Sequence, residues 1–271
     1  MRKIKINKIF LKWAILFLLM LIWGSSYILM KRGLESFSAM QVGALRVSIA
    51  FLFLLPFALL KLKTVKKENL RFFALAGLMG SGIPAFLFAE AQTGIDSQIA
   101  GILNSVAPLF TLITGVLFFG FHTKWYNVIG VFIGLTGAIG LLSAGDDKSF
   151  LSNFSFGIYI IIATVLYATN INIVKKYLKE IDVLTITSFA FVFIGIPCVI
   201  YLLAGTDFIS RMHENQHAWK SLGYLAILAI LGTAIAGIIY NYLIKISSIL
   251  FCQSGQKIKY NVARSAIPMS F

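Results

Sequence analysis

Apolar residues of this chain gather in runs of about 20, and most of the charged residues lie between the runs. A hydrocarbon core about 30 Å thick requires helical runs of that length, whereas a transmembrane strand would alternate apolar and polar residues over about 10 positions. None of the runs alternates in that way. The pattern therefore predicts an all-α fold, a polytopic membrane helix bundle.

Eight segments are predicted to span the membrane. They are 13–30, 40–60, 72–92, 98–119, 126–144, 155–174, 184–205 and 222–243. Beyond residue 251 the sequence is polar and basic and contains no run long enough to span, so 252–271 is predicted to form a cytoplasmic tail.

Composition and charge agree with a membrane protein. Of the 271 residues, 59% are hydrophobic and 13% are charged, whereas soluble domains carry about 25% charged residues. Placing the N-terminus in the cytoplasm puts 18 of the 24 Lys and Arg residues on the inner side and five on the outer side, with Arg46 inside a span. Because short cytoplasmic loops hold most basic residues, we expect a multi-pass protein of the cell (inner) membrane with both termini cytoplasmic.

The net charge of +14 follows from the same asymmetry. Nucleic-acid-binding proteins gather basic residues on one face with aromatic residues between them, whereas here they are scattered over short inner loops. We therefore expect the lipid bilayer and a small-molecule substrate as partners, and no nucleic acid. No motif predicts a cofactor or a metal ion. The sequence does not decide whether the protein forms a homodimer.

Two offsets in residue number reveal weak internal repetition. An offset of 144 joins span 1 to span 6, and an offset of 151 joins span 3 to span 8. The matched pairs include Trp23 with Tyr167, Ser26 with Asn170, Glu90 with Asn241 and Ser97 with Ser248. Because a shift of five spans is odd, the two halves are expected to have opposite orientations in the membrane, as in many transporters.

Several passages resemble one transporter family. Trp23-Gly24-Ser25-Ser26-Tyr27, followed by Lys31, Leu34 and Ala44-Leu45-Arg46, is similar to the opening of an EamA-type transporter of the drug/metabolite transporter superfamily. The passages AQTGIDSQIAGILNSVAPLF at 91–110 and IYNYLIKISS at 239–248 resemble later parts of that family, and the similarity extends over about 12–251. The resemblance implies two inverted repeats of five helices each and transport of metabolites or drugs.

The chain departs from this family pattern after residue 251. The resemblance predicts a first repeat, helices 1–5, over 12–144 and an incomplete second repeat, helices 6–8, over 155–251, which gives eight of ten expected helices. In the first half the apolar pattern continues after Ala100, but its counterpart after Phe251 is polar and basic. We therefore expect 252–271 to be a tail foreign to the family, and a truncated transporter that is largely inactive on its own.

Two ionisable residues lie inside predicted spans, where a charge at the bilayer centre costs ~2.5 to 3.5 kcal/mol. Arg46 lies about six residues, or ~9 Å, from the outer end of span 2, and Glu90 lies near the outer end of span 3. They are candidates to pair with each other, to bind a substrate carboxylate or to carry a coupling proton. The alternatives are that Arg46 extends to the head groups and that Glu90 simply lies at the interface.

Helix breaks and polar side chains mark further candidates. Span 3 contains Gly80-Ser81-Gly82-Ile83-Pro84 near its middle, and span 8 has Gly232-Thr233 at matching depth. Interrupted helices at membrane depth must line a cavity or face protein. The remaining candidate substrate-binding residues are Trp23, Ser26, Tyr27, Asn104, Tyr167, Asn170 and Asn241. Their alternative role is hydrogen bonding between helices, worth ~0.6 kcal/mol each on average.

These features together predict a secondary transporter that works by alternating access, with export as the expected direction and no ATPase motif in the sequence. A channel or scaffold without a transport cycle stays open. An intramembrane enzyme is disfavoured, because His122, His213 and His217 fall in loops and no His-Glu-x-x-His motif occurs. The candidate residues suit amino acids, other metabolites or drugs alike.

Overall fold

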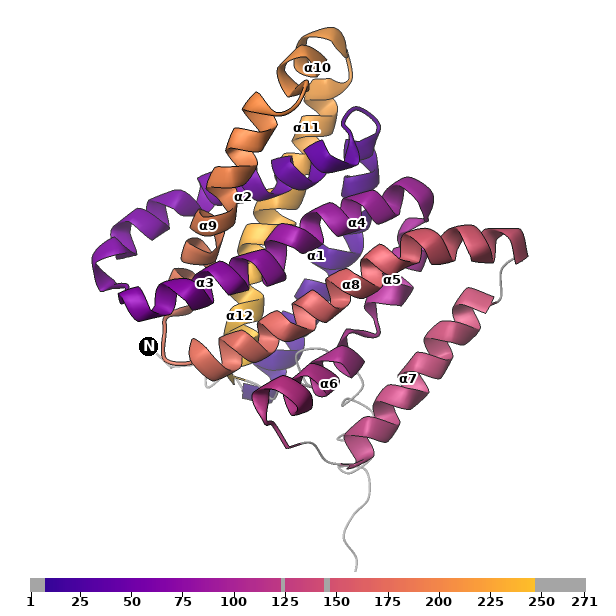
Figure 1. Cartoon of the computed structure of the whole chain (residues 1–271), viewed down its shortest axis with the longest axis vertical. Coiled ribbons are helices and arrows are strands. Elements are labelled where there is room, and N and C mark those ends of the chain that lie inside the picture. Colours follow the sequence, from indigo (N-terminus) through magenta and orange to yellow (C-terminus); the bar gives the residue numbers. More distant parts are fainter. Residues whose placement is uncertain (1–7, 123–124, 144–146, 247–271) are drawn as a thin grey trace, which may run out of the picture.

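The computed structural model describes residues 8–122, 125–143 and 147–246 (Figure 1). Every regular element within these ranges is a helix, which confirms the polytopic helical bundle. The α-helices are α1 (Lys8–Leu34), α2 (Ala39–Lys61), α3 (Leu70–Gly77), α4 (Ile83–Gly94), α5 (Ser97–Asn104), α6 (Ala107–Phe119), α7 (Trp125–Ser143), α8 (Asp147–Tyr177), α9 (Val183–Ala204), α10 (Phe208–Glu214), α11 (Ala218–Ile227) and α12 (Ala236–Ile246). Two π-helical segments, η3 (Leu78–Gly82) and η4 (Leu228–Ile235), and two 3-10 segments, η1 (Leu62–Thr64) and η2 (Lys67–Asn69), complete the described elements.

Seven helical segments of the described residues are long and apolar enough to cross a membrane. They are Phe10–Leu34, Ala39–Thr64, Lys67–Gly94, Ile99–Phe119, Ser155–Tyr177, Val183–Ala204 and Ala218–Ile246. These segments coincide with predicted spans 1 to 4 and 6 to 8. The predicted fifth span falls on α7, which is not among the seven, and the predicted tail, 252–271, lies outside the described residues. The count of eight spans therefore stays a prediction.

Two local features refine the sequence-based expectation. The sequence predicts one span over 98–119 with Ser105 and Pro108 as a candidate helix break, and the chain forms this span as α5 and α6 with a break at Ser105 and Val106. Pro108 lies in the first turn of α6, where a residue without a backbone N–H is tolerated, whereas the same residue would disrupt the interior of a continuous helix. The short helix α10 lies in what was expected to be a loop between spans 7 and 8.

Buried apolar side chains form separate clusters at the two ends of the bundle. The cluster at the predicted outer end includes Met30, Phe37, Phe88, Ala218 and Leu225. The cluster at the predicted inner end includes Leu19, Phe73, Leu178, Ile186 and Leu243. A third cluster, which includes Phe51, Leu54, Phe191 and Ile194, joins α2 to α9.

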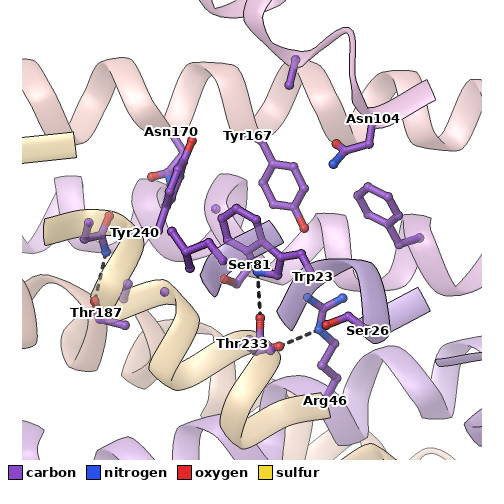
Figure 2. A pocket seen from close by; sticks show the side chains of 18 of the residues that line it. Trp23, Ser26, Arg46, Ser81, Asn104, Tyr167, Asn170, Thr187, Thr233 and Tyr240 are labelled. Atoms are coloured by element: carbon purple, nitrogen blue, oxygen red, sulfur yellow. Dashed lines mark hydrogen bonds between the residues drawn. The ribbon is translucent and has the colours of Figure 1, made fainter. Parts of the chain in front are cut away.

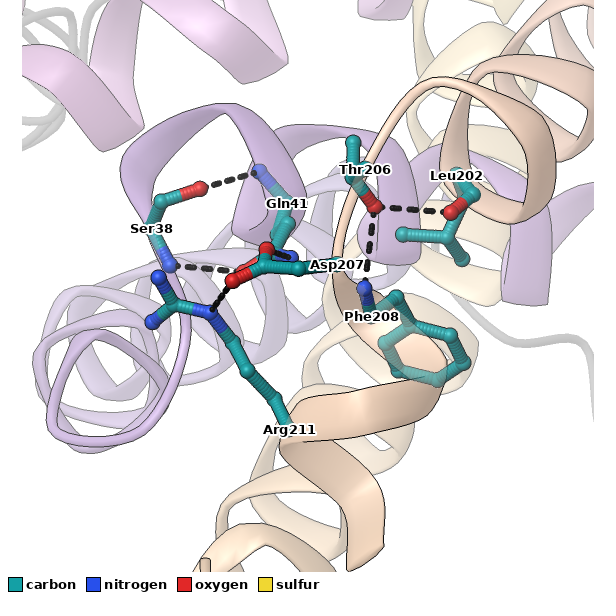
Figure 3. A network of polar contacts seen from close by, with 7 residues as sticks. All are labelled: Ser38, Gln41, Leu202, Thr206, Asp207, Phe208 and Arg211. Atoms are coloured by element: carbon teal, nitrogen blue, oxygen red, sulfur yellow. Dashed lines mark hydrogen bonds and ion pairs between the residues drawn. The ribbon is translucent and has the colours of Figure 1, made fainter. Parts of the chain in front are cut away.

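A capped helix start ties α2 to the loop beside α10 (Figure 3). The Ser38 hydroxyl accepts from the Gln41 backbone N–H at 3.3 Å, and the Gln41 Oε1 accepts from the Ser38 backbone N–H at 3.0 Å, a capping box. The Gln41 Nε2 donates to Asp207 Oδ1 at 2.7 Å. The Arg211 guanidinium, bonded to Asp207 Oδ2 at 2.7 Å, lowers the pKa of this carboxyl, so it is ionised at neutral pH.

Further polar contacts join separate elements at the same end of the bundle. Lys31 and Asp96 form an exposed ion pair at 2.8 Å, which links the last turns of α1 to the α4–α5 turn. The hydroxyls of Ser36 and Ser221 lie 2.8 Å apart and are buried, so the α1–α2 turn is bonded to α11. Figure 1 shows this turn and α10 at the upper end of the molecule and the α8–α9 turn at the lower end, where α1 begins and α12 ends.

Candidate substrate cavity

A cavity of about 330 Å³ lies between the outer and inner apolar clusters. Its wall is formed by α1, α2, α3, α4, α5, α6, α8, α9, α12 and both π segments (Figure 2). The sequence-predicted residues on this wall are Trp23, Ser26, Tyr27, Arg46, Asn104, Tyr167, Asn170 and Asn241. Ligand pockets in proteins commonly have volumes of about 300 to 1,000 Å³, so the cavity suits a small molecule.

Arg46 projects from α2 into this cavity (Figure 2). Its Nε donates to the hydroxyl of Thr233 in η4 at 2.7 Å, and that hydroxyl donates in turn to the Leu228 carbonyl at 3.3 Å. Thr233 is 6% exposed, so the bond is largely shielded from solvent. The guanidinium is therefore fixed at one nitrogen by a residue distant in sequence, while its two terminal nitrogens point toward the cavity.

The α1 side of the wall is bonded to the π segment η4. The Trp23 Nε1 donates to the Gly232 carbonyl at 3.1 Å, and the Trp23 ring packs edge-on against Tyr240 with the centroids 5.1 Å apart. The Ser26 hydroxyl donates to the Ile22 carbonyl at 2.7 Å and faces Gly232 so closely that a Cβ at Gly232 would lie 2.6 Å from it. Only glycine fits this position without a shift of the Ser26 side chain or of α1.

A matching contact joins α8 to the other π segment, η3. A Cβ at Gly80 would lie 2.4 Å from the Asn170 Nδ2. The Asn170 Oδ1 is buried and has no hydrogen-bond partner in the described part of the chain, and the same holds for the Asn104 Oδ1 on α5. A buried acceptor without a hydrogen-bond donor destabilises the protein, because its bonds to water are lost and not replaced. The two carboxamide oxygens are therefore available to a ligand.

Aromatic rings line the region between Arg46 and the outer cluster. Phe88 packs against Tyr27 with the centroids 6.1 Å apart and against Tyr167 at 5.8 Å. Both phenols lie within electrostatic reach of the Arg46 guanidinium. Asn241, on α12, donates from Nδ2 to the Thr187 hydroxyl at 2.9 Å. The wall thus combines flat apolar surfaces with a few hydrogen-bonding groups.

Glu90 is the one predicted site residue that is not on the cavity wall. Within the described residues it forms no ion pair with Arg46, so the expected pairing is not observed. The reason is helical phase: Phe88 faces the cavity, and two residues later the helix has turned by about 200°. Arg46 is therefore the only charged side chain on the wall among the described residues.

Several lining residues were not among the predicted candidates. They include Phe88, Thr187 and Tyr240. Ser81 and Thr233 also lie on the wall, and they belong to the predicted helix breaks, which were expected to line a cavity or face protein. Tyr240 is adjacent to Asn241. Phe88 and Thr187 carry no signal in the sequence that separates them from other residues of an apolar helix.

Comparison with known proteins gives one family match. The model of the EamA-like transporter family matches residues 11–143 and 155–251. An Escherichia coli (strain K12) protein named "Uncharacterized inner membrane transporter YedA" is 31% identical over 236 residues, which cover 85% of this chain and 73% of that protein. An Archaeoglobus fulgidus protein named "Uncharacterized transporter" is 25% identical over 80% of this chain and 76% of its own length.

Two further similarities are more distant. A Streptantibioticus cattleyicolor protein named "Probable terminal-alkyne amino-acid exporter" is 22% identical over 52% of this chain and 48% of its own length. A solved crystal structure covers 96% of this chain and 90% of its own chain with a TM-score of 0.59 and 15% sequence identity. At that identity the structural likeness shows the fold alone.

The contact between Ser26 and Gly232 gives a testable prediction. Gly232→Ala should lower the melting temperature of the purified protein in detergent, because the added methyl group would overlap the Ser26 hydroxyl and overpacking costs about 1 to 3 kcal/mol. Adding Ser26→Ala should restore much of the loss. Gly223→Ala is the matched control, since a Cβ there would meet nothing within 4 Å. Equal melting temperatures for Gly232→Ala and Gly223→Ala would contradict the contact.

Proposed function

This chain belongs to the EamA-like transporter family, and from that premise we propose that it is a secondary transporter of small metabolites that works by alternating access. The observation that carries the proposal is the cavity between the two apolar clusters, because residues from both halves of the chain form its wall. Secondary transporters bind substrate near the bilayer midplane, at the boundary between two structural repeats.

We further propose that the halves, 12–144 and the segment that begins at residue 155, are inverted repeats. The packing of the helices supports this proposal. The first helix of the first half, α1, packs against α11, η4 and α12 of the second, and the first helix of the second half, α8, packs against α3, η3 and α4 of the first. The equivalent helices α2 and α9 pack against each other. Each of these contacts made by a helix of one half thus has an equivalent made by the matching helix of the other half.

The π segments supply independent support for the repeat. The sequence offset of 151 carries η3, Leu78–Gly82, onto 229–233, which lies inside η4, Leu228–Ile235. π-helical turns are rare and are frequently found at functional sites. Two of them at equivalent positions of two equivalent spans are therefore unexpected unless the spans share an origin and a role.

The glycine contacts follow the same relation. Ser26 on α1 abuts Gly232 in η4, and Asn170 on α8 abuts Gly80 in η3. The offset of 144 pairs Ser26 with Asn170, and the offset of 151 brings Gly80 to within one residue of Gly232. Each contact joins a helix of one half to the irregular segment of the other half. We propose that these contacts are the surfaces on which the halves rock during alternating access.

Export is the proposed direction of transport. It is supported by the exporter name of the Streptantibioticus cattleyicolor relative, which is similar to about half of this chain. The family and the other named relatives are transporters, a class distinct from enzymes. The same residues would line the pore if the protein were a channel. Transport kinetics must therefore distinguish a carrier from a channel.

Exchange kinetics test the transporter proposal directly. The sequence predicts a truncated and largely inactive transporter, whereas we propose that the chain retains exchange, because residues of both halves complete the cavity wall. The full chain in proteoliposomes loaded with a defined mixture of organic acids, amino acids and sugars should then release at least one compound faster when the same compound is present outside, because a carrier returns faster when loaded. Liposomes without protein are the control, and release is followed by mass spectrometry. Release that is no faster than from the control, or that external compound does not accelerate, would contradict a carrier; the latter indicates a channel.

The proposed orientation places both termini in the cytoplasm, on the basis of the 18 to five partition of basic residues. Green fluorescent protein fused after Phe271 should fluoresce in a bacterial host, since it folds only in the cytoplasm. Alkaline phosphatase fused after Asn215, which follows α10, should be active, because it requires the periplasm. A dark fluorescent-protein fusion together with an active phosphatase after Phe271 would reverse the orientation.

A further inference from the structure

We propose that the ligand of this cavity is a small organic acid whose single carboxylate binds Arg46 and whose other end carries a hydrogen-bond donor that reaches Asn104 or Asn170. This inference rests on the proposed transport function and narrows its substrate class. The sequence left amino acids, other metabolites and drugs equally open.

The charge of the wall selects against cations. Among the described residues, Arg46 is the only charged side chain on the wall, and neither Asp nor Glu is present there. A guanidinium in a low-dielectric site is stabilised by a negative charge nearby and destabilised by a positive one. A cationic ligand would therefore meet repulsion with no compensating carboxylate, whereas an anionic ligand supplies the charge that the wall lacks.

The geometry of Arg46 favours a carboxylate among anions. Its Nε is occupied by the Thr233 hydroxyl at 2.7 Å, and this bond holds the plane of the guanidinium. The terminal nitrogens point into the cavity (Figure 2). Arg binds planar carboxylates through two parallel N–H bonds, and a guanidinium that is already fixed loses less entropy when it does so. Thr233 is thus a positioning residue for this bond.

The unsatisfied carboxamide oxygens call for a donor on the same ligand. The Oδ1 atoms of Asn104 and Asn170 are buried on the wall without a partner in the described part of the chain. In Figure 2 both side chains lie across the cavity from Arg46, on the side of Tyr167. An ammonium, amide or hydroxyl group at the far end of the ligand would satisfy one of them. A simple fatty acid would leave both unbonded.

The space between these polar ends is bounded by flat rings. Tyr27, Phe88 and Tyr167 form one continuous set of ring contacts, and Trp23 packs against Tyr240. With a cavity volume of about 330 Å³, this arrangement suits a compact body that packs on aromatic faces. Large lipophilic drugs do not match both the size and the paired polar ends.

Matched ligands test this assignment on the purified full chain. Three probes share one skeleton: 4-hydroxyphenylacetate, its primary amide, which lacks the carboxylate, and phenylacetate, which lacks the distal donor. A panel of other carboxylic acids with their primary amides, and the cation tetraphenylphosphonium, extend the set. Binding is measured by thermal stabilisation and calorimetry, and transport by exchange in proteoliposomes.

We expect the acids that carry a donor to bind, and each matched amide to bind about tenfold more weakly or worse, as loss of a charged hydrogen-bond pair implies. Arg46→Gln should abolish the preference for acid over amide. The control Arg32→Gln, which removes only an exposed ion pair with Glu35, should retain it. Asn104→Ala or Asn170→Ala should reduce the preference for 4-hydroxyphenylacetate over phenylacetate while the preference for acid over amide persists.

Three outcomes would overturn the proposal. They are equal binding of acids and amides, tighter binding of tetraphenylphosphonium than of any acid, and no stabilisation by any acid at millimolar concentration. Saturable exchange of a neutral or cationic compound would leave the transport function standing and reject this ligand class. Binding of acids that depends on Arg46, without exchange, would support the site and reject the transport function.

Discussion

A guanidinium within a membrane span requires a compensating partner, and the position of Arg46 connects the main features of this structure. Arg46 belongs to the first half of the chain, yet its Nε is bonded to Thr233 in the second half. Thr233 lies in η4, and its hydroxyl also donates to the Leu228 carbonyl of the same segment. The bond to Arg46 therefore depends on η4. The charge, the irregular segment and the boundary between the halves therefore meet at one place, and the cavity surrounds it.

Glycine governs how closely the halves approach around this cavity. Gly232 admits the Ser26 hydroxyl and Gly80 admits the Asn170 carboxamide, in each case at a distance that a methyl group would block. Both glycines lie in π segments, so a polar side chain of one half meets irregular backbone of the other. These contacts do not interlock side chains as an apolar core does. A boundary with two such contacts therefore suits a movement of the two halves between discrete arrangements.

The length of the apolar runs was sufficient to predict the helical bundle, because hydrocarbon thickness fixes the length of a span. The cost of a buried charge was sufficient to single out Arg46. The position of Glu90 near the end of a span does not fix the direction in which its side chain points; its helical phase relative to Phe88, about 200°, turns it away from the cavity wall. The contact of Asn170 with Gly80 and the hydroxyl of Thr233 depend on packing between residues far apart in the chain, which no local pattern encodes.

The central claim is that the halves move relative to each other during transport, and a disulfide across them tests it most directly. The Ser36 and Ser221 hydroxyls lie 2.8 Å apart at one end of the boundary, so Ser36→Cys with Ser221→Cys, in a chain that also carries Cys198→Ala and Cys252→Ala, should form a disulfide on oxidation. The account predicts that the oxidised protein loses exchange in proteoliposomes and regains it after reduction. Unchanged exchange by a fully cross-linked protein would contradict it.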